Sequence, residues 1–71
     1  MKVIVKEAIK LGSGCEIYVY KHKYRGQLLD MIAEDVKWLG NICEDKEVYD
    51  NEAHVYGGDY TFNYYIREME E

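Results

Sequence analysis

The residues best suited to chemistry are tyrosines and basic side chains that alternate along one stretch near the amino end. From Cys15 to Arg25 the chain reads CEIYVYKHKYR. Tyrosine rings stack on nucleobases while lysine and arginine meet phosphate, so one chemistry is capture of a nucleotide or RNA. Clustered tyrosines with arginine also occupy the centres of protein interfaces. The stretch therefore offers ligand stacking or protein contact.

Catalytic arrangements find less support. His22 and His54 are candidate general bases, but neither stands near a serine or cysteine nucleophile in a recognisable arrangement. Ser13 lies between two glycines in a turn, without the strand-to-helix context that a phosphate-binding loop requires. We expect a chain that is not an enzyme and that holds no cofactor.

Carboxylates dominate a second stretch. Residues 1–25 carry six basic and two acidic side chains, whereas residues 26–71 carry three basic and twelve acidic ones, for a net charge of −5. The densest acidic run comprises Glu44, Asp45, Glu47, Asp50 and Glu52. It lacks the central glycine and ordered ligand series of a calcium loop, so we expect no metal there. Such a run could instead match the basic cleft of a nucleic-acid-binding protein.

Hydrophobic periodicity indicates the elements that carry these groups. Residues 2–11 and 15–25 alternate with period two around a Gly12–Gly14 turn, which predicts a hairpin with Ile9 beside Ile17. Residues 26–39 repeat apolar side chains at three- and four-residue steps and predict a helix. Residues 53–56 and 60–66 flank Gly57-Gly58 and predict a second hairpin with Val55 beside Tyr60. Residues 43–52 could hold a short strand near Val48 but are expected to be chiefly loop.

This order predicts an α+β fold with a ββαββ arrangement in one domain, residues 1–71. A four-stranded, mainly antiparallel sheet would be covered on one face by the single helix. The predicted core comprises Val3, Val5, Ile9, Leu11, Ile17, Val19, Leu28, Ile32, Val36, Leu39, Val55, Phe62 and Ile66.

One helix can cover only one face, so the other face would carry the tyrosines. The candidate ligand or partner-binding residues on that face are Lys6, Tyr18, Tyr20, His22, Tyr24, Arg25, Tyr56 and Tyr65. Three interpretations stay open: an ordinary water-facing surface, a protein interface, and a site for a nucleotide or other phosphate ligand.

Size and composition set further expectations. A chain of 71 residues has a small core and gains stability by pairing, which favours a homo-oligomer, a dimer or higher, formed through the tyrosine-bearing sheet face. Cys15 and Cys43 are expected to be buried, reduced thiols, with a single disulfide bridge as the alternative, since one would help so small a core. Without a long apolar run or a signal-peptide pattern, a soluble cytoplasmic protein without membrane contact is expected.

Together these features predict a small acidic binding protein that associates stoichiometrically with a partner protein. It would act as an inhibitor or adaptor, with the acidic run as the favoured contact. Inhibitors encoded by mobile elements that block host nucleic-acid-binding proteins offer an analogy. The alternative is an oligomeric protein that sequesters a small nucleotide or RNA on its tyrosine- and lysine-rich sheet face.

Overall fold

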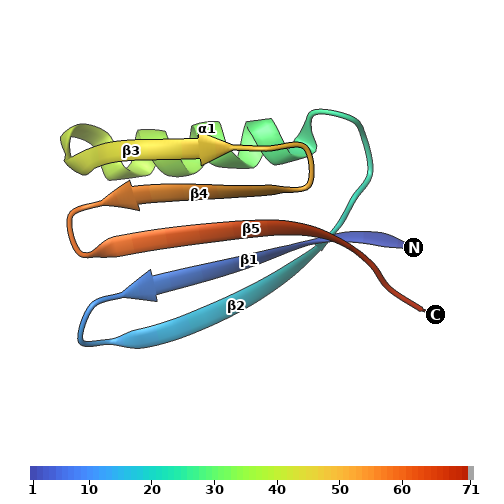
Figure 1. Cartoon of the computed structure of the whole chain (residues 1–71), viewed down its shortest axis with the longest axis horizontal. Helices are drawn as coiled ribbons and strands as arrows, with labels where there is room; N and C mark the ends of the chain where they lie inside the picture. The colour runs from blue at the N-terminus through green and yellow to red at the C-terminus, as the bar shows by residue number, and fades with distance from the viewer. Residues whose placement is uncertain (71) are drawn as a thin grey trace.

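One helix lies against one face of a five-stranded sheet in the computed structural model, which describes residues 1–70 (Figure 1). The strands and the α-helix are β1 (Lys2–Lys10), β2 (Gly14–Lys21), α1 (Gln27–Leu39), β3 (Cys43–Val48), β4 (Glu52–Gly57) and β5 (Tyr60–Glu68). A short 3₁₀ turn, Gly40–Ile42, joins α1 to β3. The sheet order is β2-β1-β5-β4-β3, and every neighbouring pair is antiparallel. The predicted α+β class with a single helix is confirmed.

The predicted count of four strands is wrong, because the acidic run contributes strand β3. Lys46 pairs with Val55 and Val48 pairs with Ala53. Aspartate and glutamate have low strand propensity, so the run resembles a loop in sequence. Its pairing with the buried strand β4 overrides that propensity, and its position at the sheet edge leaves the carboxylates in water.

The helix forms as its periodicity predicts, with Leu28, Ile32 and Leu39 buried against the sheet. It ends at Gly40, which takes a φ of 61° and donates its N–H to the Val36 carbonyl. Among residues 1–70, no helix has the length and apolar character needed to cross a membrane.

Close contact with β4 fixes the helix over one side of the sheet. A Cβ at Gly57 would lie 2.9 Å from the Ile42 carbonyl oxygen and 3.0 Å from Leu39 Cδ1, closer than van der Waals contact allows. Glycine therefore lets the chain that follows α1 rest directly on β4. Figure 1 shows α1 beside β3 and β4, with β1 and β2 on the far side of β5.

The pairing of β1 with β5 decides which face of the first hairpin meets the helix. Ile4 lies opposite Ile66, and Ala8 lies opposite Phe62. Even-numbered residues of β1 therefore share the helix side with the apolar face of β5. The buried core comprises Ile4, Leu28, Ile32, Leu39, Ala53, Val55, Phe62 and Tyr64, with Ala8, Met31, Val36, Cys43, Tyr60 and Ile66 packed against it.

The prediction that odd-numbered residues of the first hairpin face the helix is therefore wrong. Leu11 is 78% exposed, Ile17 63% and Val19 54%. Val5 and Ile9 are half-buried on the opposite sheet face, where Val3 is buried beside its neighbours in the sheet. Either face of the hairpin has enough apolar surface to pack, and its pairing with β5 selected the other one.

Both hairpins pair two residues away from the predicted register. Ile9 lies opposite Cys15 rather than Ile17, and Val55 lies opposite Phe62 rather than Tyr60. A shift of two preserves which residues share a face, so the predicted faces within each hairpin are retained.

The two cysteines are free, as expected, but neither is fully buried. Cys15 is exposed on edge strand β2 and Cys43 is partly buried at the start of β3. The expectation of two buried thiols is wrong because the sheet face that carries Cys15 has no helix over it.

Candidate functional site

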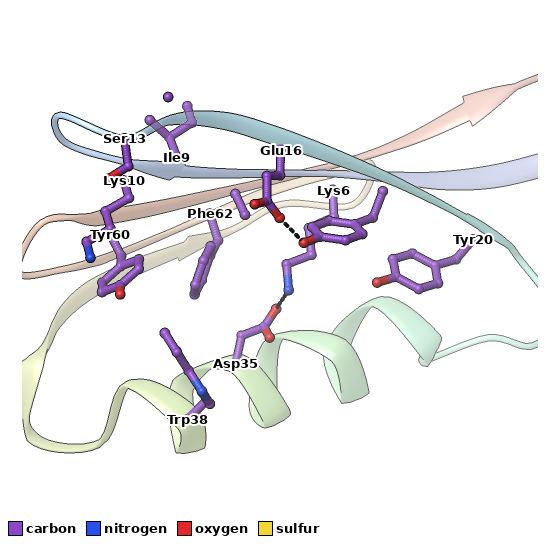
Figure 2. A pocket seen from close by; sticks show the side chains of 13 residues that line it. Lys6, Ile9, Lys10, Ser13, Glu16, Tyr20, Asp35, Trp38, Tyr60 and Phe62 are labelled. Carbon is purple, nitrogen blue, oxygen red and sulfur yellow. Dashed lines mark hydrogen bonds and ion pairs between the residues drawn. The ribbon is translucent and has the colours of Figure 1, made fainter.

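A cleft opens between α1 and the β1–β2 half of the sheet (Figure 2). The cleft has a volume of about 430 Å³. Its aromatic lining consists of Tyr18, Tyr20, Trp38, Tyr60 and Phe62. Its charged lining consists of Lys6, Lys10, Glu16 and Asp35. Aromatic walls with a few polar groups are typical of small-molecule sites of this size.

The aromatic wall is built by packing between the helix and β5. The Trp38 ring meets Tyr60 edge-on, with centroids 5.1 Å apart, and lies 6.2 Å from the Phe62 centroid. Trp38 is nonetheless 64% exposed, so much of its indole faces the opening. Ala8 lies opposite Phe62, and because its side chain is a single methyl group, it leaves space at the bottom of the cleft. The rings are thus held by the core while part of their surface stays free.

An ion pair joins the two sides of the cleft. Lys6 Nζ lies 2.8 Å from Asp35 Oδ2, and both side chains are largely shielded from water. The Tyr64 hydroxyl donates to the same carboxylate oxygen. The Lys6 ammonium also lies 4.9 Å from the Phe62 ring centroid, a cation–π distance. Figure 2 shows Lys6 and Asp35 reaching toward each other across the cleft, from β1 and α1.

Lys10 is the cation left available for a ligand. It is exposed, its ammonium lies 5.5 Å from the Tyr60 ring centroid, and no ion pair involves it within residues 1–70. Ser13 lines the same end of the cleft. An anionic group placed there would meet a positive charge beside an aromatic ring.

Tyr18 and Glu16 form the outer wall on strand β2. The Tyr18 hydroxyl donates to Glu16, and this hydrogen bond raises the pKa of the hydroxyl. The Tyr18 and Tyr20 rings lie nearly parallel, 6.5 Å apart. Both residues are partly exposed, because no neighbouring strand covers β2.

The sequence-predicted tyrosine face is divided by the structure. Lys6, Tyr18 and Tyr20 come together in the cleft, on the helix side of the sheet. Tyr56 and Tyr65 lie on the opposite face. The prediction of one shared face is wrong because β1 pairs with β5 in the register that brings even-numbered β1 residues toward the helix.

The remaining predicted basic and aromatic residues follow β2 and do not line the cleft. His22 donates its backbone N–H to the Lys2 carbonyl at 3.0 Å. Tyr24 donates its hydroxyl to Asp30 at 2.9 Å, which ties the loop to the start of α1. Arg25 is exposed next to this contact.

The uncovered face carries its own polar contacts. His54 Nδ1 lies 2.7 Å from Asn63 Oδ1, and its Nε2 lies 3.4 Å from the Glu52 carboxylate. The Tyr56 hydroxyl donates to Glu47 at 3.3 Å, and the His54 ring meets Tyr65 edge-on. These contacts satisfy the histidine within the sheet surface, far in the strand order from the cleft wall on β2.

The predicted acidic residues all lie in or next to the edge strand β3. Glu44, Asp45 and Glu47 belong to β3, whereas Asp50 precedes β4 and Glu52 begins it. All five are exposed. Within the described part of the chain, no group of three or more histidine, cysteine, aspartate or glutamate side chains could hold a metal ion.

Sequence reasoning missed the cleft residues Lys10, Asp35, Trp38 and Tyr60. For Lys10 a signal was present in the even-numbered series of β1, where Ile4 and Ala8 are apolar positions between lysines. Asp35, Trp38 and Tyr60 come from the helix and from β5, and no local pattern indicated them. Comparisons with protein-family models, curated proteins and solved structures find no match to this chain.

Removal of Asp35 should weaken the fold more than removal of its neighbour Glu34. Asp35→Ala leaves the shielded Lys6 ammonium and the Tyr64 hydroxyl without their partner, and we expect a loss of about 2–3 kcal/mol in the free energy of unfolding. Glu34→Ala, an exposed control on the same helix, should change it by less than about 0.5 kcal/mol. Urea denaturation measures both, and equal effects would show that the ion pair is not structural.

Tyr64 should make the fold sensitive to alkali. Burial, together with the hydrogen bond to Asp35, strongly raises the pKa of its hydroxyl. The neutral hydroxyl is favoured in the folded state, so its stabilisation is complete below about pH 10 and declines as the pH rises further. Between about pH 10 and 11.5, Tyr64→Phe should lose stability less steeply than the native chain, by about 1 kcal/mol per pH unit.

Exposed Tyr49 provides the matched control: its hydrogen bond to Glu47 also raises the pKa of its hydroxyl, but water screens this interaction, so Tyr49→Phe should change the pH dependence far less than Tyr64→Phe does. Chemical denaturation at a series of pH values measures the three slopes. Parallel curves for the native chain and Tyr64→Phe would contradict the role given to this hydroxyl.

Proposed function

We propose that this chain is a non-catalytic binding protein that captures a small ligand carrying a flat aromatic ring and an anionic group. A nucleotide is the favoured ligand class. The observation that supports this proposal is the combination, in one cleft, of partly exposed rings with a cation that has no carboxylate partner in residues 1–70.

The division of charge in the cleft defines the expected pose. Lys6 is held by Asp35 at 2.8 Å, so this lysine serves mainly to keep the cleft in shape. Lys10 is exposed at the end lined by Ser13 and Tyr60. A base would stack against Trp38 or Tyr60 while its phosphate meets Lys10 and the Ser13 hydroxyl.

The positions of the two histidines support a binding role for the cleft and not a catalytic one. Neither His22 nor His54 lines the cleft, and the latter is engaged by Asn63 and Glu52 on the other face. Ser13 therefore has no histidine beside it to act as its general base.

Trp38 gives a direct test, since it is the only tryptophan in the chain and lines the cleft. Titration with nucleoside mono- and triphosphates should quench its fluorescence, with dissociation constants of micromolar order. Inorganic phosphate and uncharged nucleosides should bind far more weakly, because each supplies only half of the contacts.

Variants assign the contacts in the same experiment. Lys10→Ala should weaken binding by about tenfold, and Tyr60→Ala by about tenfold or more, in line with a stacking contribution of 1–3 kcal/mol per base. Tyr56→Ala, on the opposite face, should bind as the native chain does. Absence of binding at millimolar nucleotide, checked by calorimetry, would contradict the proposal.

A second candidate function rests on the acidic edge of the sheet. Exposed Glu44, Asp45 and Glu47 on β3, with Asp50 and Glu52 beside it, concentrate negative charge at one border of the molecule. Such a border could occupy the basic cleft of a nucleic-acid-binding protein and act as a stoichiometric inhibitor.

Charge removal tests this second candidate. The immobilised chain should retain a basic partner from a native extract in a salt-dependent manner, and Glu44→Gln/Asp45→Gln/Asp50→Gln should lose it. Glu68→Gln/Glu70→Gln, which removes charge elsewhere, should retain it. Equal retention by both variants would contradict a role for the β3 edge.

A further inference from the structure

Strand β2 is an exposed edge strand of the sheet. All eight residues of β2 are exposed. Its two most exposed large apolar side chains are Ile17 and Val19. The helix does not cover this edge, because α1 lies beside β3 and β4, at the other end of the strand order. An open strand of this length is a template for pairing with another strand.

The backbone of β2 is oriented for such pairing. His22 donates its N–H to the Lys2 carbonyl, which places the even-numbered residues in the hydrogen-bonded pairs with β1. Because these pairs alternate along an antiparallel ladder, the N–H and C=O groups of Cys15, Ile17 and Val19 point away from β1. They form a regular row of donors and acceptors along the edge.

The opposite edge of the sheet is protected by contrast. Strand β3 carries Glu44, Asp45 and Glu47, and its pairing with β4 shifts register between Cys43 and Asp45. Charges and irregular pairing are the usual means of preventing edge-to-edge association. The charges make a β3–β3 contact repulsive, and the register shift disfavours a β2–β3 contact, which would continue without closure.

We propose that β2 pairs antiparallel with β2 of a second copy of this chain, so that two sheets join into one ten-stranded sheet. The two-fold axis would pass beside Tyr18. Ile17 then lies opposite Val19 of the second copy, and Glu16 lies opposite Tyr20 of the second copy. This register is centred on the strand and uses the outward backbone groups of nearly its whole length.

Charge along the strand favours a second copy in this orientation. Glu16 stands near the beginning of β2, whereas Lys21 ends it and Lys23 and Arg25 follow closely. Antiparallel pairing brings the acidic beginning of one strand toward the basic end of the other. Parallel pairing would place like charges side by side.

Two copies could also associate by stacking their uncovered faces. Pairing through the edge avoids the cost of desolvating a charged group that such stacking would carry. Glu7 lies in the middle of the apolar area on that face, opposite Ile17 on β2 and Asn63 on β5. A second sheet stacked there would remove this carboxylate from water, at a desolvation cost. Edge pairing leaves Glu7 in water.

The dimer would extend the cleft described above. Tyr18 of each copy would form the closest cross-strand pair, on the helix side of the joined sheet. Tyr20 of the second copy would stand beside Glu16, so each cleft gains an aromatic residue from its partner. The inference rests on the strand edge and holds whether or not a nucleotide binds.

Sedimentation equilibrium without any ligand tests the association. The native chain should be a dimer at about 50 μM. Ile17→Pro removes an outward N–H while sparing the ladder to β1, and edge strands tolerate such a proline. This variant should weaken the dimer by about fiftyfold or more, with circular dichroism confirming that it folds.

Two variants separate edge pairing from other contacts. Ile17→Thr keeps the backbone donor and a β-branched side chain, so it should remain dimeric. Val5→Lys places a charge on the uncovered face, opposite Val19, and leaves the outward backbone groups of β2 unchanged, so it should also remain dimeric. A monomeric native chain, or a dimer lost in Val5→Lys and kept in Ile17→Pro, would overturn the proposal.

Disulfide trapping tests the register, independently of the proline variant. In a Cys15→Ser/Cys43→Ser background, Tyr18→Cys should link two copies on mild oxidation, because facing residues of a non-hydrogen-bonded pair lie about 4.5 Å apart at Cα. Tyr20→Cys should not link, since the two copies of that position would be about 13 Å apart. Equal linking of both variants would overturn the proposed register.

Discussion

A single helix is too narrow for this sheet, and the rest of the structure follows from that mismatch. Five strands span roughly 19 Å across the sheet, whereas one helix with its side chains is about 10–12 Å wide. Contact between Gly57 and the chain after Leu39 draws the helix toward β4. Strand β2 is therefore left without a covering layer, and the cleft and the open edge both lie along it.

Lys6 shows how the fold uses a polar residue in a half-covered place. Its position in β1 directs it toward the helix, where a charged group needs a partner. Asp35 provides that partner at 2.8 Å and also accepts the Tyr64 hydroxyl. The helix is consequently joined to the sheet by apolar packing at Leu28, Ile32 and Leu39 and by this polar contact beside the cleft.

Local patterns predicted the helix and both hairpins because each depends on neighbouring residues. The pairing of β1 with β5 does not, since it joins residues more than fifty positions apart, such as Ile4 and Ile66. Both faces of the first hairpin carry apolar side chains, so periodicity alone could not identify the one that packs. Strand β3 was missed for a related reason. Its carboxylates have low strand propensity, and its pairing with buried β4 forms only in the folded sheet.

The candidate site was predictable only in part. Lys6, Tyr18 and Tyr20 were identified from their alternation, and the structure brings them together. Trp38 and Tyr60 join them from the helix and from β5, which no local pattern could indicate. Tyr56 and Tyr65 share their chemistry but lie on the other face, because residue type does not determine which side of a sheet a strand presents.

The side of β1 that faces the helix is the central claim, and proton–proton nuclear Overhauser contacts measure it directly. This account requires contacts from Lys6 to Asp35 and from Ile4 to the apolar side chains of the helix. Contacts from Val5 or Ile17 to Ile32 and Val36, with none from Lys6 to the helix, would contradict it.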